Sequence, residues 1–269
     1  MEQAGVQLLL GAKSLVVVGW LALMLGLERL KPATPWKQGA DGFSQPRHVF
    51  HNLSFWGLNA LLSPLLVLPV TLAAAAHAIP WRPADWPLWA MVPLDIILLD
   101  LWIYGWHRLN HEWPFLWRFH QVHHFDEQLD STTALRFHFG EVLLSALARS
   151  PVILLLDIPF VSVIAFEILV LVGSIFHHSN ISLPRRFESA LSRVMITPAI
   201  HWVHHHARQR DTDSNYGTIL SVWDRLFASR SRRRRSPDMT IGIEGRAENR
   251  LLPLLLMPFR SDRSVAGRL

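Results

Sequence analysis

The sequence has 269 residues, 50% of them hydrophobic, and it contains no cysteine. The lack of thiols excludes disulfide bonds, cysteine-ligated iron–sulfur clusters, thiolate-ligated haem and cysteine nucleophiles, and leaves histidine and carboxylate chemistry. The net charge of +5 is concentrated in Arg225, Arg230 and Arg232 to Arg235. On a soluble domain this pattern would indicate nucleic acid binding, but beside long apolar runs it marks the cytoplasmic side of a membrane protein, and no nucleic acid partner is expected.

Long apolar runs predict membrane-spanning helices. Leu8 to Leu27 contains Lys13 as its only full charge, and Leu53 to Ile79 contains no acidic residue, lysine or arginine. Each run is long enough to cross roughly 30 Å of hydrocarbon. Because Met1 to Gly5 carries no basic cluster, we expect the first run to be a retained span rather than a cleaved signal peptide. A third run extends from about Trp86 to Trp106.

A fourth apolar run, from about Val142 to Phe176, is too long for one span. The segments Arg149-Ser-Pro151 and Asp157-Ile-Pro159 interrupt it, and proline breaks a helix near the preceding turn. We therefore expect two short helices in a hairpin that enters and leaves on the same side. The predicted fold is all-α, a polytopic membrane protein with four or five membrane helices and a cytoplasmic histidine-rich helical cap.

This organisation divides the chain into three expected parts. Residues 1–87 would form N-terminal transmembrane helices, residues 88–228 a histidine-rich di-metal domain, and residues 229–269 a basic C-terminal tail. The tail contains an apolar patch, Leu251 to Phe259, that is too short to span a membrane. We expect this patch to lie on the membrane surface or to pack against the cap.

Basic residues in the connections predict the orientation. Four of them lie between the first two spans, whereas only Arg82 lies between the second and third. The positive-inside rule therefore places the first connection in the cytoplasm, and the chain after Trp106 returns to that side. A same-side hairpin brings the segments 107–138 and 177–206 to one face. Short connections and the lack of eukaryotic targeting signals favour a bacterial inner membrane.

Eight histidines fall into three motifs with helical spacing. An HxxxH motif ends the third span, and two HxxHH motifs follow Trp113-Pro114 and Thr197-Pro198, where proline suits the first turn of a new helix. Positions i, i+3 and i+4 share one helix face, so the imidazoles of each motif can reach one ion. Chance would give one HxxHH motif about 0.05 times at this histidine frequency, so the repetition indicates a built site. The motif residues are His107, His111, His120, His123, His124, His201, His204 and His205.

Eight neutral imidazoles are too many for one ion and suit two ions, and imidazole binds Fe, Zn, Cu and Ni. The spacing does not separate iron from zinc. Histidines that cap membrane helices at the interface are the alternative interpretation, and we expect it for His48, His51 and His77, which match no motif. His206 points about 100° away from His205 on a helix and is not expected to bind a metal.

Three further residues are provisional members of the site. His138 and His178 lie beside the motifs and are either ligands or hydrogen-bond partners of ligands. Asp100 precedes His107 by two helical turns, and metal-bound histidines commonly donate to a carboxylate. A polar contact between helices is the alternative for this intramembrane acid.

The motifs together resemble the fatty acid hydroxylase/sterol desaturase superfamily over roughly residues 90–227. Beside the histidine spacing, the resemblance rests on Arg136-Phe-His138, His178-Ser-Asn180, Asn215-Tyr-Gly217 and Trp223-Asp-Arg-Leu-Phe227. The run from Leu116 to His124 resembles the branch that contains alkylglycerol monooxygenase-like proteins. The resemblance implies two iron ions, held by the eight motif histidines on the cytoplasmic side. It also implies hydroxylation of a lipid C–H bond with O2 and two external electrons.

The sequence departs from that family at two places. Phe137-His138-Phe139 stands where many relatives have Phe-His-Pro, and Phe227-Ala-Ser stands where they often have Phe-Gly-Thr. Neither departure touches a motif histidine, so both concern the substrate rather than the metals. The substrate expected is a membrane lipid of fatty acyl, sterol-like or ether type.

No flavin, nicotinamide, haem or iron–sulfur motif is present, so electrons are expected from a separate ferredoxin, cytochrome b5-like protein or reduced pterin. The run Arg230 to Arg235 would dock an acidic donor or face lipid and solvent. Desaturation on the same metal site is the main alternative activity. A divalent-metal transporter would bury its histidines within spans, and a zinc hydrolase would need a base such as the Glu of HExxH, which is absent.

Overall fold

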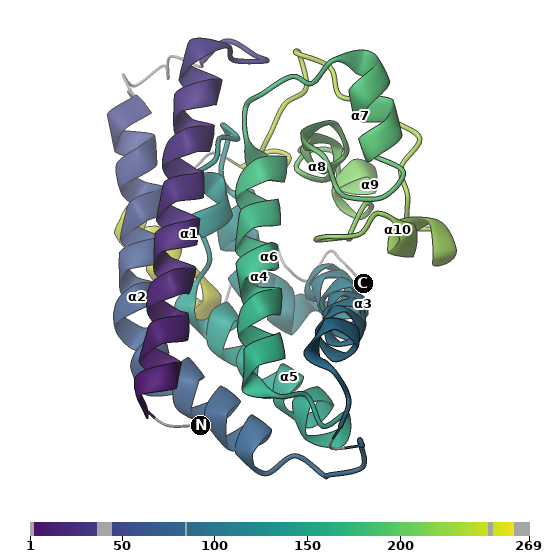
Figure 1. Cartoon of the computed structure of the whole chain (residues 1–269). Helices are drawn as coiled ribbons and strands as arrows, with labels where there is room; N and C mark the ends of the chain where they lie inside the picture. The colour runs from purple at the N-terminus through teal and green to yellow at the C-terminus, as the bar shows by residue number, and fades with distance from the viewer. Residues whose placement is uncertain (1–2, 37–44, 84, 247–249, 261–269) are drawn as a thin grey trace.

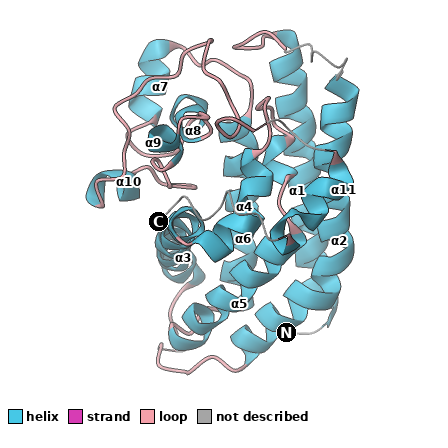
Figure 2. Cartoon of the chain, turned by 180° about the vertical axis from the view of Figure 1, so that it is seen from behind, coloured by secondary structure: helices cyan, strands magenta, loops and turns pink. Residues whose placement is uncertain are grey.

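The computed structural model describes residues 3–36, 45–83, 85–246 and 250–260. In these residues the chain forms helices and loops without a β-strand (Figure 2). The all-α fold class is therefore confirmed. The five long helices are α1 (Gln3–Leu30), α2 (Gln45–Ala76), α3 (Leu88–Glu112), α5 (Phe139–Leu155) and α6 (Phe160–His178). The shorter elements are α4 (Pro114–His124), η1 (Thr133–Leu135), α7 (Arg185–Leu191), α8 (Pro198–His204), α9 (Gln209–Thr212), α10 (Val222–Leu226), α11 (Leu251–Leu256) and η2 (Met257–Phe259).

Four of the long helices, α1, α2, α3 and α6, are long and apolar enough to cross a membrane, with mean hydropathy between 1.6 and 2.2. Their outward side chains remain uncovered by protein, as Leu15, Leu65 and Trp89 show with exposed fractions of 78%, 70% and 80%. Such broad apolar surface is stable in lipid but not in water. The chain is an integral membrane protein.

The expected hairpin is formed by α5 and α6, and it breaks once rather than twice. Residues 156–159 separate the two helices, with Asp157 at a positive φ of 51°. The second expected break, at Arg149-Ser-Pro151, is wrong, because α5 continues through Pro151. Proline removes only one backbone donor, a loss that packed membrane helices tolerate. The hairpin tip meets the α2–α3 connection, where Ile79 N donates to Leu154 O at 2.9 Å.

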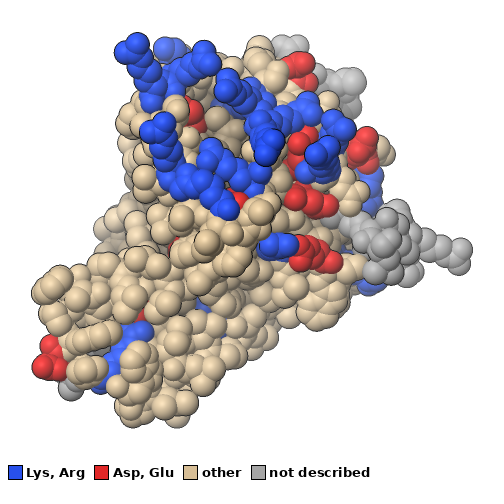
Figure 3. Space-filling view, turned by 90° about the vertical axis from the view of Figure 1, so that its right-hand side faces the viewer, with Lys and Arg blue, Asp and Glu red and all other residues tan. Residues whose placement is uncertain are grey.

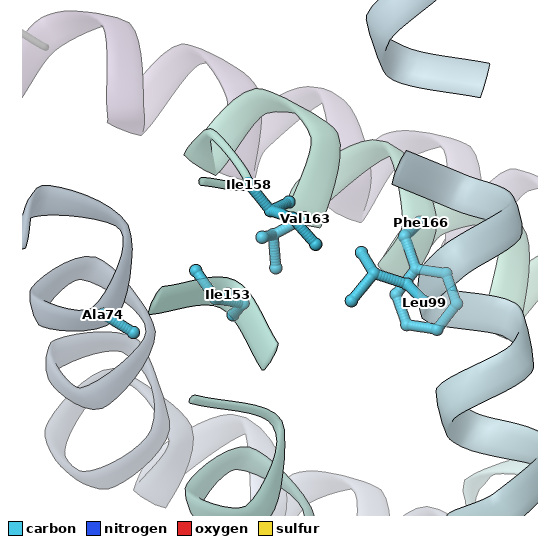
Figure 4. Close-up of a cluster of buried hydrophobic side chains, with 6 residues drawn as sticks. All are labelled: Ala74, Leu99, Ile153, Ile158, Val163 and Phe166. Carbon is cyan, nitrogen blue, oxygen red and sulfur yellow. The ribbon is translucent and has the colours of Figure 1, made fainter. Parts of the chain in front are cut away.

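The long helices pack in pairs, α1 and α3 against α6 and α2 against α5 (Figure 1). An apolar cluster joins α2, α3, α5 and α6 near the hairpin tip (Figure 4). Its buried apolar side chains pack together and fix the relative positions of these helices. The members are Ala74, Leu99, Ile153, Ile158, Val163 and Phe166.

The shorter elements form a cap at the end of the helices where α3 and α6 end (Figure 1). Lysine and arginine gather over the cap, whereas the visible surface of the long helices is mostly uncharged (Figure 3). The C-terminal apolar patch folds back on this cap as α11 and η2. Leu254 and Met257 pack with Phe55 of α2 and with Val122 and Phe125 of the α4 region. We expected this patch on the membrane surface or against the cap, and the structure shows it packed against the cap.

Candidate metal centre

Nine histidines converge in the interior where the cap meets the long helices, and they form two groups. Within each group, one ring nitrogen from every histidine lies within 4.8 Å of those of the others. The first group contains His107, His111, His120, His124 and His204. The second group contains His123, His178, His201 and His205. All eight motif histidines are thus brought together, and His178 joins them.

The four histidines of the second group point their Nε2 atoms at one position. His178 Nε2 lies 2.9 Å from His201 Nε2, 3.1 Å from His123 Nε2 and 3.2 Å from His205 Nε2. Nitrogen atoms that bind one ion at about 2.1 Å and at right angles lie about 3.0 Å apart. The spacing therefore matches a set of ligands around a single metal ion.

Hydrogen bonds on the far side of the rings fix which nitrogen faces the metal position. Nδ1 lies 2.8 Å from a carbonyl oxygen in His107 (Tyr216 O) and in His178 (Ser174 O), and 2.7 Å from Ser214 O in His204. A carbonyl oxygen only accepts, so each Nδ1 must carry the proton and each neutral ring keeps a bare Nε2. Orientation by such acceptors is typical of metal-binding histidines.

Two carboxylates play the same part in the first group. His120 Nδ1 lies 2.7 Å from Glu141 Oε1, and His111 Nδ1 lies 3.4 Å from Asp213 Oδ1. Glu141 also accepts from Asn110 Nδ2 at 3.3 Å. A carboxylate acceptor makes the opposite nitrogen of the imidazole a stronger ligand.

The donor atoms fit a pair of metal ions. The Nε2 atoms of His120 and His204 are buried and have no hydrogen-bond partner. Buried polar atoms are normally paired, and a bare imidazole nitrogen in an apolar interior costs free energy unless a ligand satisfies it. Nitrogen donors in sets of five and four suit two transition-metal ions such as Fe or Zn.

Burial keeps the cap histidines neutral. Desolvation, followed by the neighbouring imidazoles, lowers the pKa of His123, His124, His201 and His205 well below the usual 6.5. Burial also lowers the pKa of His204, to about 3. A metal ion needs the neutral imidazole, so these rings can bind at neutral pH without first losing a proton.

The segments Asn215-Tyr-Gly217 and Trp223-Asp-Arg-Leu-Phe227 hold the backbone that orients a histidine of the first group. Asp224 accepts from Tyr216 N at 2.7 Å and from Gly217 N at 2.9 Å, and so holds the carbonyl that orients His107. A Cβ at Gly217 would lie 2.8 Å from Asp224 Oδ2 and from Ile196 Cδ1, so only glycine fits. Asn215 has a positive φ of 55°, which asparagine tolerates better than most residues.

Two provisional residues lie outside both groups. His138 caps α5, with Nδ1 accepting from Gly140 N at 3.0 Å and Nε2 lying 3.1 Å from Leu255 O. Both ring nitrogens are engaged, so this side chain has none left for a metal. Asp100 does not contact His107, which differs from the expected orienting role. It accepts instead from the backbone N–H groups of residues 219 and 220, both at 3.1 Å, and from Trp223 Nε1 at 2.7 Å.

The remaining histidines separate clearly from the two groups. His206 bonds Asp211 at 2.8 Å. His48 and His51 are buried in the protein, and His48 lies in a polar network beside Asp126 and Asp130. We call this the Glu28 network. It consists of Glu28, His48, Asn52, Asp126, Asp130, Ser131, Thr132 and Thr133.

The acceptors that orient the histidine rings were not among the predicted site residues. Glu141 was the one with a usable signal, because it is an isolated acid at the start of an apolar run. The carbonyl oxygens of Ser174, Ser214 and Tyr216 carry no signal at all, since every residue has one. Their selection depends on how α6 and the loop after α9 fold against the rings.

A cavity of about 560 Å³ begins at the histidines and extends between α1, α2, α5 and α6. His107, His120, His123, His178 and His201 line one end, and the wall beyond them is mostly apolar. A further set of lining residues, Lys13, Arg149 and Glu167, is charged. The volume is sufficient for a long alkyl chain.

The family model for fatty acid hydroxylase matches residues 92–229. The chain is 28% identical to an ornithine lipid hydroxylase of Rhizobium tropici over 95% of its length and 78% of that relative. It is 30% identical to an alkylglycerol monooxygenase of Danio rerio, over 64% of the chain and 38% of the relative. A cholesterol 25-hydroxylase of Rattus norvegicus is 26% identical over 64% of the chain and 59% of its own length. No solved structure matches the chain.

Proposed function

The chain belongs to the fatty acid hydroxylase family, and from this premise we propose that it is a membrane-bound di-iron oxygenase that hydroxylates a C–H bond of a lipid. The substrate would be a fatty acyl, sterol-like or ether lipid, in keeping with the names of its relatives. The reaction would consume O2, two electrons and two protons, and would yield an alcohol and water.

One observation carries the proposal, namely that nine histidines in two adjoining groups border an apolar cavity among membrane helices. An apolar substrate can reach such a site without leaving the hydrocarbon phase. A metal transporter would need a polar path across the membrane, whereas the cavity wall beyond the histidines is mostly apolar.

The side chains of the site have distinct tasks. The first group would hold one iron ion through His107, His111, His120, His124 and His204, and the second group would hold the other through His123, His178, His201 and His205. Bound iron would supply the oxidising chemistry. Glu141 orients His120, and the surrounding apolar wall excludes water, which protects the reactive site from side reactions.

Electrons would come from an external donor, which we expect to be a ferredoxin, a cytochrome b5-like protein or a reduced pterin. The arginine run is available to an acidic donor only in part. Arg235 stacks on Trp202 at 3.6 Å, and Arg233 pairs with Asp211 at 3.2 Å. Arg232 and Arg234 remain exposed.

We place the cap in the cytoplasm and the protein in a bacterial inner membrane. The gathering of lysine and arginine over the cap supports this orientation, since cytoplasmic loops carry an excess of both (Figure 3). The bacterial source of the ornithine lipid hydroxylase supports the location.

The decisive experiment is anaerobic purification with metal analysis, followed by lipid analysis of cells with and without the gene. About two iron ions per chain and a lipid that gains the mass of one oxygen atom are expected. A lipid that loses two hydrogen atoms would instead establish desaturation. One zinc ion with unchanged lipids would overturn the proposal, and metal uptake into liposomes without O2 consumption would favour transport.

A further inference from the structure

Three charged side chains meet in the wall of the cavity, away from the histidines. They come from three different helices, Lys13 from α1, Arg149 from α5 and Glu167 from α6. Lys13 Nζ lies 2.5 Å from Glu167 Oε2, and Arg149 Nη2 lies 2.6 Å from Glu167 Oε1. All three line the cavity, with side-chain exposures of 23%, 8% and 19% for Lys13, Arg149 and Glu167. We call them the charged triad.

The charged triad has more donors than acceptors. Two cations share one carboxylate, which leaves one positive charge unbalanced among the described residues. Lysine carries three N–H donors and arginine five, whereas a carboxylate offers about four acceptor sites. Arg149 Nε is buried and has no partner. An unbalanced charge among membrane helices is costly unless an anion compensates it, so the charges of this site suit an anionic ligand.

A purely structural role does not account for the second cation. Lys13 alone would tie α1 to the α5–α6 hairpin through a neutral pair with Glu167. The Arg149–Glu167 pair only links α5 to α6, which the connection 156–159 already joins. The additional cation raises the cost of burial unless something in the cavity balances it. The cavity beside the charged triad has the room, at about 560 Å³.

The position of the charged triad sets a distance. Glu167 precedes His178 by 11 residues on α6, which corresponds to about 16 Å along the helix. Val170 and Leu171 line the cavity between them. A ligand that touches both ends therefore needs an acidic group at one end and an alkyl chain toward the histidines.

We propose that Lys13 and Arg149 bind the acidic group, a carboxylate or a phosphate, of an amphiphilic substrate whose oxidised carbon lies about 16 Å away. Glu167 holds the two cations at the spacing of the anion's oxygens. The inference rests on the proposed function for the identity of the reaction, but the binding site itself is independent of turnover.

Binding to the metal-free protein, without O2, tests the site directly. Hexadecanoate, hexadecyl phosphate and hexadecanol would compete with a fluorescent fatty acid on the purified full-length chain in detergent. At least one acidic ligand is expected to bind about tenfold or more tightly than the alcohol, and the better of the two identifies the anion. Equal binding of all three ligands would overturn the proposal.

Lys13→Met and Arg149→Met should each reduce this acid preference about tenfold, while Lys31→Met and Arg185→Met, which change exposed residues, should leave it intact. Because each triad variant leaves a neutral pair with Glu167, thermal unfolding should occur at the same temperature or higher. A lower unfolding temperature with an unchanged acid preference would show that the charged triad is only a helix clamp.

Regiochemistry in the active enzyme gives a second readout. When an acidic substrate is lengthened by two carbons, the hydroxyl position counted from the acidic group should stay constant. A hydroxyl position that stays constant when it is counted from the methyl end of the substrate would overturn the proposal. If no hydroxylation occurs but the acid preference depends on Lys13 and Arg149, the proposed reaction fails while the binding site stands.

Discussion

The histidine centre and the Glu28 network are both buried and polar, yet they differ in how their polar atoms are paired. Glu28 accepts from Ser131 N at 3.1 Å, Ser131 Oγ at 3.0 Å and Asn180 N at 2.9 Å. In the histidine centre, by contrast, the Nε2 atoms of His120 and His204 have no hydrogen-bond partner. A polar region that serves the fold pairs most of its polar atoms within itself, whereas one that serves a ligand keeps metal-binding nitrogen atoms unpaired.

The largest expected effect comes from removing a metal-facing ring. His204→Ala should lower hydroxylation at least about 100-fold and reduce the bound metal, because its free Nε2 belongs to the first group. Metal analysis and product formation measure both. His206→Ala is the matched control, since that ring pairs with Asp211 outside both groups. Full metal content in His204→Ala would contradict the assignment.

Glu141→Gln tests the carboxylate that orients His120 in the histidine centre. The amide cannot offer the charged acceptor that holds His120, so metal affinity or activity should fall about 10- to 100-fold. Metal titration of the metal-free protein measures the affinity. Glu112→Gln, an exposed carboxylate on α3, should leave it unchanged. An equal fall in both variants would show that Glu141 has no special role.

Glu28→Gln should have the opposite profile, a loss of stability with the metal retained. Replacing the carboxylate puts an amide N–H group among three donors, which costs about 1–3 kcal/mol of unfolding free energy. The unfolding temperature in detergent would fall by several degrees while metal content per folded chain stays constant. Loss of metal without loss of stability would remove the contrast between the two regions.

The smallest effect is expected at His138, which caps α5. His138→Ala should cost about 1 kcal/mol by leaving Gly140 N without its acceptor, and His138→Asn should recover part of it. Activity per bound metal should be unchanged in both variants. Lower metal content in His138→Asn would instead make this histidine a ligand.

The sequence predicts the parts of the site that follow from helical spacing. The eight motif histidines follow from local periodicity and the hairpin that joins them follows from proline, so both could be predicted from the sequence. The partners of Asp100 could not be predicted, because residues 219 and 220 lie more than a hundred residues from it in the sequence. The helix break predicted at Pro151 was wrong for a related reason, since packing against neighbouring helices decides whether a helix continues through proline.

His178 shows most clearly which part of the metal site the sequence does not predict. It belongs to no motif of the expected form, and only its contacts with His123, His201 and His205 place it in the second group. Its neighbour His177 has the same sequence context and a buried ring, but lies outside both groups. The rotation of the last turn of α6 separates the two, and sequence periodicity does not fix that rotation.

The folding back of α11 onto the cap has a consequence for protein engineering. The family match ends at residue 229, but Leu254 and Met257 cover Phe55, Val122 and Phe125, and Leu255 O contacts His138. A chain trimmed to the matched segment would therefore expose the back of the helix that carries His120, His123 and His124. Grafting the catalytic segment into another scaffold would require a substitute for this C-terminal cover as well as for α1 and α2.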